Sequence, residues 1–103
     1  MSQENYFDLA HQEDGNIVIR FSDHGKEELG ALTFIDLPAD GAELTKGQPF
    51  LDVEAEKAVT NLDSPVSGTV VASNGILADT PDAVSDSDPD KNWVLVVKPS
   101  KEN

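Results

Sequence analysis

The clearest pattern of hydrophobic and polar positions lies in the middle of the chain. Leu51, Val53 and Ala55 alternate with acidic residues, which is the period of two expected of a half-buried strand. Strand-favouring residues resume at Val59. Between the two runs, the charged pair Glu56-Lys57 predicts a tight turn. The pattern therefore predicts a hairpin with Lys57 exposed at its tip.

Other short runs of strand-favouring residues recur along the chain, with turn residues between them. The strongest turn signal is Asp14-Gly15, because this pair tolerates the positive φ that tight hairpin turns need. A short extended piece is expected between Gly41 and Gly47. The remaining predicted strands are residues 6–10, 17–21, 31–37, 69–73 and 93–97. The run at 17–21 is almost continuously apolar, so we expect both of its faces to be covered.

Two minor helices are predicted. Ser22 or Asp23 can cap the first, over residues 24–29, although Gly25 should weaken it. The second is a single turn over 81–84, capped by Asp79 or Thr80. Gly30 stands where the glycine that ends a helix belongs, and Asn74-Gly75 predicts a turn. Many short strands and few helices indicate a mostly β fold, a small β-sandwich or flattened barrel.

Length and charge narrow the class of protein. The 103 residues predict a single domain over 1–103, with disordered tails at 1–4 and 99–103. The formal net charge of −13 opposes binding to nucleic acids and to anionic membranes, and suits partners with basic docking surfaces. The chain shows no secretory leader and no apolar run of membrane-spanning length. We therefore expect a protein of the cytoplasm, or of an organelle lumen if a transit peptide has been removed, and a monomer by default.

Candidate catalytic groups are scarce. The chain has no cysteine, so thiol nucleophiles and thiolate metal sites are excluded. Neither His11 nor His24 has a second histidine nearby in sequence, so we predict no metal site. The acidic run over 82–90 lacks the glycine and the final glutamate of a calcium-binding loop, and is expected to be a solvated loop. We predict no active site, which suits a carrier, because a carrier needs only a positioned attachment point.

Four segments in the expected order resemble the glycine cleavage system H protein family. Residues 23–38 are similar to one stretch of that family, and Glu54-Ala55-Glu56-Lys57-Ala58-Val59 is similar to its lipoyl-attachment motif. Residues 64–71 resemble the segment that follows the motif, and Asn92-Trp93 precedes a run like the family's last strand. The resemblance covers roughly residues 5–99. It implies a hammerhead sandwich of the lipoyl and biotinyl type, with lipoate attached to Lys57 through an amide bond.

The resemblance also implies partners and recognition residues. In the family, the lipoyl arm takes an aminomethyl group from a P-type glycine decarboxylase and passes it to a T-type aminomethyltransferase. Dihydrolipoyl dehydrogenase then reoxidises the arm, which a lipoate ligase or lipoyltransferase attaches in the first place. Glu54 and Gly68 match positions that help the attaching enzyme recognise its target. Their alternative interpretations are a surface strand residue and a plain turn glycine.

Departures from the family pattern point to a variant. Residues 5–9 replace a His-Glu-Trp segment, Glu56 is unusual beside the lysine, and no helical extension follows Pro99 in this sequence. These features resemble short H-like proteins that are encoded beside a sirtuin and a macrodomain protein. In that group the lipoylated protein is reversibly ADP-ribosylated as part of a response to oxidative stress. The acidic pair Glu27-Glu28 is the candidate acceptor, with Glu27 as the specific residue, and its alternative interpretation is a solvated helix face. A related possibility is a lipoyl relay to other dehydrogenase complexes.

Two further classes stay open at this point. A biotinyl carrier would share the fold, but methionines typically flank the biotinylated lysine, and here Glu56 and Ala58 take those places. An unmodified protein of the same fold could serve as a binding module. The state of Lys57 in cells supplied with lipoate distinguishes these classes from a lipoyl carrier.

Overall fold

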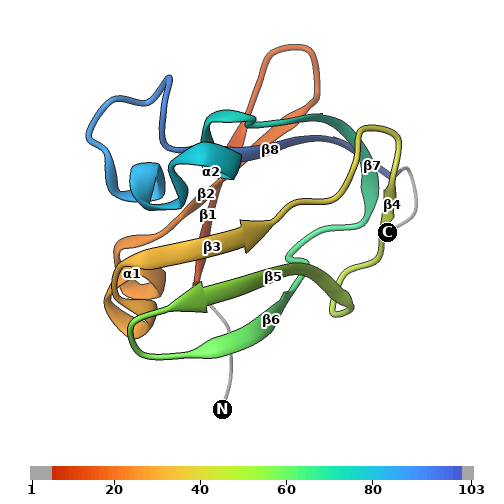
Figure 1. Ribbon diagram of the computed structural model, residues 1–103. Helices are drawn as coiled ribbons and strands as arrows, with labels where there is room; N and C mark the ends of the chain where they lie inside the picture. Colours follow the sequence, from red (N-terminus) through yellow and green to blue (C-terminus); the bar gives the residue numbers. More distant parts are fainter. Residues whose placement is uncertain (1–5, 101–103) are drawn as a thin grey trace.

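A computed structural model describes residues 6–100 and shows two antiparallel sheets packed face to face (Figure 1). The predicted mostly β sandwich is confirmed. One sheet has three strands in the order β3-β5-β6, which are β3 (Leu32–Asp36), β5 (Pro49–Ala55) and β6 (Val59–Asp63). The other has five strands in the order β1-β2-β8-β7-β4, which are β1 (Phe7–His11), β2 (Ile17–Phe21), β8 (Trp93–Pro99), β7 (Gly68–Ser73) and β4 (Glu43–Leu44).

The core lies between the two sheets and is built from branched aliphatic side chains. Ile19 and Leu95 of the larger sheet and Val53 and Leu62 of the smaller one are all fully buried. The period of two in β5 explains this arrangement, because alternate side chains point to opposite faces of a strand. In β2, Val18 is buried as well as Ile19, so the expectation that both faces of this strand are covered is confirmed.

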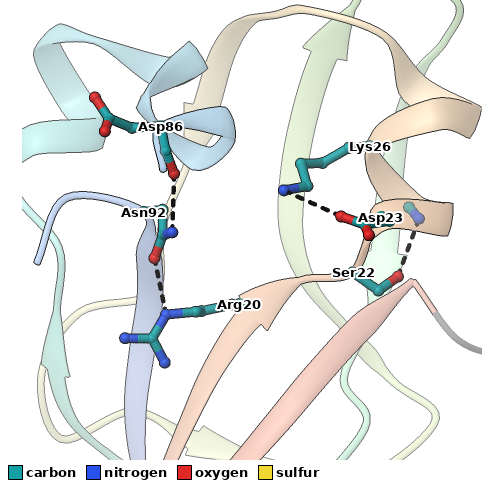
Figure 2. A network of polar contacts seen from close by, with 7 residues as sticks. Arg20, Ser22, Asp23, Lys26, Asp86 and Asn92 are labelled. Atoms are coloured by element: carbon teal, nitrogen blue, oxygen red, sulfur yellow. Dashed lines mark hydrogen bonds and ion pairs between the residues drawn. The ribbon is translucent and has the colours of Figure 1, made fainter. Parts of the chain in front are cut away.

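Helix α1 (Asp23–Leu29) follows β2 directly. Its N-cap is Ser22, whose hydroxyl oxygen accepts a hydrogen bond from the Gly25 backbone N–H at 3.0 Å. Figure 2 shows this cap beside the ion pair that Lys26 makes with Asp23. Gly25 was expected to weaken the helix, but the structure gives it a reason: a Cβ atom there would collide with the backbone carbonyl of Tyr6. Glycine therefore lets the Tyr6 backbone lie directly against the helix.

The region before β8 differs from the prediction. The turn expected at Asn74-Gly75 is present, but helix α2 (Ile76–Asp79), which was not predicted, follows it directly. The helical turn predicted at 81–84 is the 3₁₀ helix η1 (Pro81–Ser85), and Thr80 makes no side-chain cap. Asn74 is buried and donates from Nδ2 to the carbonyls of Lys91 and Trp93, while its Oδ1 accepts from the Ile76 N–H. The side chain thus joins α2 to the start of β8.

Arg20 holds the acidic loop after η1 against the larger sheet. The Arg20 guanidinium donates to Asn92 Oδ1 at 2.8 Å and to the Pro89 carbonyl at 3.0 Å. Asn92 Nδ2 in turn donates to the Asp86 carbonyl (Figure 2). Strand β8 then runs to Pro99, which pairs with Gly68. Pro99, which was predicted to belong to a disordered tail, is therefore part of a strand, while the predicted tail residues 1–4 and 101–103 lie outside the described part of the chain.

Candidate modification site at the β5–β6 hairpin

Lys57 lies in the turn of the hairpin formed by β5 and β6. The two strands pair with Val53 opposite Thr60 and Glu54 opposite Val59, and the Ala55 N–H donates to the Ala58 carbonyl at 2.8 Å to close the turn. Lys57 itself is exposed. The predicted hairpin with a lysine at its tip is confirmed.

The hairpin tip does not project freely into solvent, because it rests on the C-terminal end of α1 (Figure 1). The Lys57 N–H donates to the Leu29 carbonyl at 2.9 Å, and its ammonium Nζ donates to the Glu27 carbonyl at 2.7 Å. The Glu56 N–H donates to the Ala31 carbonyl at 3.0 Å. These contacts join segments about thirty residues apart in sequence. The sequence did not predict these contacts. The segment around Gly30 was interpreted only as the end of a helix, and not as a surface on which the hairpin rests.

Glu54 lies on the outward face of the three-stranded sheet. The strand register places it between Phe34 of β3 and Val59 of β6. Both neighbours are apolar and solvent-accessible, with 46% of Phe34 and 78% of Val59 exposed. The three side chains line a shallow hollow that also includes Asp52 and Thr60. This face combines apolar contact area with carboxylates next to the Lys57 turn.

Gly68 occupies a different environment from Lys57. Gly68 is the first residue of β7, in the larger sheet. Lys57 lies before β6 in the smaller sheet, whereas Gly68 lies after it. A Cβ atom at Gly68 would collide with the Lys98 carbonyl and would come within 2.8 Å of a Val97 methyl group. The alternative of a plain turn glycine was therefore wrong, because the close approach of β8 requires glycine at this strand position.

Glu27 is the predicted site residue that the structure brings to Lys57. Both Glu27 and Glu28 are exposed on α1. The backbone carbonyl of Glu27 accepts the hydrogen bond from Lys57 Nζ. Glu27, which was selected for its acidic side chain, thus lies beside Lys57, although the two residues are 30 positions apart in sequence.

Among residues 6–100, no three His, Cys, Asp or Glu side chains are grouped so that they could hold a metal ion. His24 packs edge-on against the ring of Tyr6 with centroids 5.7 Å apart. Within the same residues, no helix has the length and apolar character needed to cross a membrane.

Comparison with known proteins decides the family. The family model described as glycine cleavage H-protein matches residues 2–103. The chain belongs to this family. Glycine cleavage system H protein from Geobacillus kaustophilus is 46% identical over 88 residues, which cover 85% of this chain and 69% of that protein. The corresponding protein of Oceanobacillus iheyensis is 44% identical over 91 residues, covering 88% of this chain and 72% of that protein.

A solved structure agrees with this assignment. The crystal structure of a glycine cleavage system H protein from Mycobacterium marinum matches with a TM-score of 0.81 and 26% identity, covering 95% of this chain and 81% of that one. Members of the family carry lipoate covalently on a lysine, and they act as carriers rather than as catalysts. Membership of the glycine cleavage system implies partners of the P-protein and T-protein types. An exposed lysine on a hairpin tip fits such an attachment.

Proposed function

We propose that Lys57 carries the lipoyl group and that the protein serves as a lipoyl carrier of the glycine cleavage H type. The observation that supports this most strongly is the exposed Lys57 in the closed turn between two paired strands. A lysine held there presents its Nζ to an attaching enzyme while the backbone stays ordered. Amide formation on Nζ would give one long, flexible arm made of the lysine stem and the lipoyl chain.

The arm explains how a chain without a cysteine can take part in sulfur chemistry. The reactive sulfur atoms belong to the cofactor, and the protein supplies attachment and docking. Tethering makes each transfer effectively local once the carrier has docked. We propose that the arm delivers an aminomethyl group from the P-type partner to the T-type partner, and that dihydrolipoyl dehydrogenase reoxidises it. In this proposal the chain itself is not an enzyme, and it acts as a cytoplasmic monomer.

Glu54 is our candidate for recognition by the lipoate ligase or lipoyltransferase. Glu54 lies on β5, the strand that leads into the Lys57 turn, and its neighbours on the adjacent strands are the exposed residues Phe34 and Val59. Exposed aromatic residues such as Phe34 are enriched at protein interfaces, and a carboxylate beside one can fix the orientation of a partner with basic groups. Gly68 is retained as a second recognition position, although the packing of β8 against it already accounts for the absence of a side chain.

The test is intact mass and peptide mapping after coexpression with a lipoate ligase and supplied lipoate. We expect a lipoyl increment confined to Lys57 and lost in Lys57→Ala. Lys57→Arg is the matched control, because it keeps the positive charge but cannot be acylated by the ligase. A biotinyl increment would place the protein among biotin carriers. A folded, unmodified protein beside an active ligase would contradict the proposal and favour a binding module.

A second function is favoured by the position of Glu27. We propose that the protein acts in the manner of the short H-like variants, as a target of a sirtuin-type ADP-ribosyltransferase and of a macrodomain hydrolase. Glu27 is exposed and lies next to Lys57, so a modification there would depend on the state of the lysine. A lipoyl relay to other dehydrogenase complexes would use the same arm.

This second function makes its own prediction. With such a transferase and NAD, we expect an ADP-ribosyl increment on lipoylated protein that Glu27→Gln abolishes and Glu28→Gln leaves in place. Peptide mapping by mass spectrometry locates the increment. Equal labelling of both variants would exclude Glu27 as the acceptor. If lipoylated protein is not labelled at all, the stress-linked role is contradicted, whereas the proposal that Lys57 carries lipoate is unaffected.

A further inference from the structure

We infer that Glu56 is a positioning residue for Lys57: it anchors the hairpin tip to the Gly30–Ala31 corner while the lysine side chain alone moves. The inference rests on the proposed function, since it concerns how the attachment lysine is presented. Its structural part, the anchoring of the tip, applies to the unmodified protein.

The first contact is reciprocal and joins Glu56 with Ala31. The Glu56 N–H donates to the Ala31 carbonyl at 3.0 Å, and the Ala31 N–H donates to the Glu56 carboxylate Oε1 at 3.0 Å. The last backbone pair between β3 and β5 is Leu32 with Ala55, so this contact lies one residue beyond it on each strand. The carboxylate takes the place that a backbone carbonyl would occupy in a continued ladder. A carboxylate accepting from a backbone N–H makes a stronger bond than a neutral acceptor.

Gly30 makes room for this contact. Its φ is +76°, which favours glycine, and a Cβ atom there would come within 2.8 Å of Glu56 Oε1 and 3.0 Å of Glu56 Cβ. The corner between α1 and β3 is therefore shaped around the Glu56 side chain. Gly30 and Glu56 lie 26 positions apart in sequence, yet one accommodates the other.

The second contact is made by Lys57 and consists of a backbone hydrogen bond and a side-chain hydrogen bond. Acylation of Nζ affects these two bonds differently. The last carbonyls of a helix have no partners within the helix, and a cation near that end is favourable. The Lys57 N–H satisfies the Leu29 carbonyl and its ammonium satisfies the Glu27 carbonyl. Acylation leaves the backbone bond unchanged. It removes the charge at Nζ, so the side-chain bond loses its charge assistance.

Acylation also requires the ammonium to leave the helix end. With an acyl adenylate as the activated lipoyl donor, the nitrogen must lose one proton before its lone pair attacks the acyl carbon. The N–C bond forms as the C–O bond to the phosphate breaks, AMP departs, and a second proton leaves the nitrogen. During this exchange the Glu56–Ala31 pair and the Lys57 N–H bond still hold the tip to the end of α1 and the start of β3. Glu56 thus limits the motion to the side chain.

The experiment compares Glu56→Ala with Glu56→Gln, and uses Glu13→Ala as the control, an exposed acid near the turn of another hairpin. Glutamine keeps an oxygen that can accept from Ala31, whereas alanine does not. The first readout is amide hydrogen exchange of Ala31 and Lys57 in the unmodified protein. The second is kcat/KM for lipoylation by a lipoate ligase.

We expect Glu56→Ala to speed exchange of the Ala31 N–H by at least about fivefold and to lower kcat/KM by a similar factor, as the loss of one hydrogen bond implies. Glu56→Gln and Glu13→Ala should stay near the wild-type values. If glutamine behaves like alanine, or if alanine changes neither readout, Glu56 is not a positioning residue. If wild-type Lys57 is not lipoylated, the proposed function fails, and the exchange readout still decides whether Glu56 anchors the tip.

Discussion

Single residues in this protein are explained by their spatial neighbours more than by their local propensity. Gly25 is the clearest example, because it lies inside a seven-residue helix where alanine would be the better helix former. The backbone carbonyl of Tyr6 approaches so closely that no Cβ fits, and the same carbonyl accepts a hydrogen bond from the Ser22 N–H at 2.8 Å. The glycine therefore allows the N-terminal segment to pair with the residue that caps α1.

This contact predicts the sign of a substitution. We expect Gly25→Ala to lower the free energy of unfolding by about 2 kcal/mol, because the cost of overpacking against backbone exceeds the gain of about 1 kcal/mol in helix propensity. Thermal or urea unfolding measures the change.

Gly75→Ala is the matched control for this substitution. Its φ is −62°, and a Cβ atom there meets nothing within 4 Å. Its effect should stay within about 0.5 kcal/mol. A Gly25→Ala protein that is as stable as the wild type, or more stable, would show that the Tyr6 segment moves aside.

At the scale of elements, the strands could be predicted from their local sequence pattern, whereas helix α2 depends on contacts with neighbouring elements. The period of two over β5 determines which side chains face the core, and Asp14-Gly15 forms its turn with Gly15 at a φ of +91°. Helix α2 has only four residues and no side-chain cap of its own. The buried side chain of Asn74 supports it by joining its first turn to the start of β8. A four-residue helix has too little local stabilisation to be recognised from propensity.

At the scale of the whole molecule, charge is the dominant feature. Twenty acidic residues stand against seven basic ones, and the formal net charge is −13. Many of the carboxylates are exposed, including Asp52, Glu54 and Glu56 around the hairpin. Self-repulsion of this kind destabilises the folded state at low ionic strength, and it favours partners whose docking surfaces are basic.

Screening should therefore stabilise the protein. We expect Tm to rise as sodium chloride increases from about 10 mM to about 200 mM, because the Debye length falls from about 30 Å to below 10 Å over this range. Differential scanning calorimetry at pH 7 measures the shift. Chloride is the appropriate salt, since sulfate would also strengthen apolar burial. A Tm that is flat or decreasing over this range would show that the exposed carboxylates do not repel one another appreciably in the folded state.

The sequence by itself determined the mostly β class, the hairpin around Lys57 and the helix that begins after Ser22. Each of these depends on residues that are close in sequence, where strand period, turn chemistry and caps are decided. Only the tertiary structure showed that the Lys57 turn rests on the end of α1, that Glu56 pairs with Ala31, and why Gly25 and Gly68 carry no side chain. Those features are contacts between segments that lie far apart in the chain. The pattern of residues along the sequence does not predict which of these segments will come into contact.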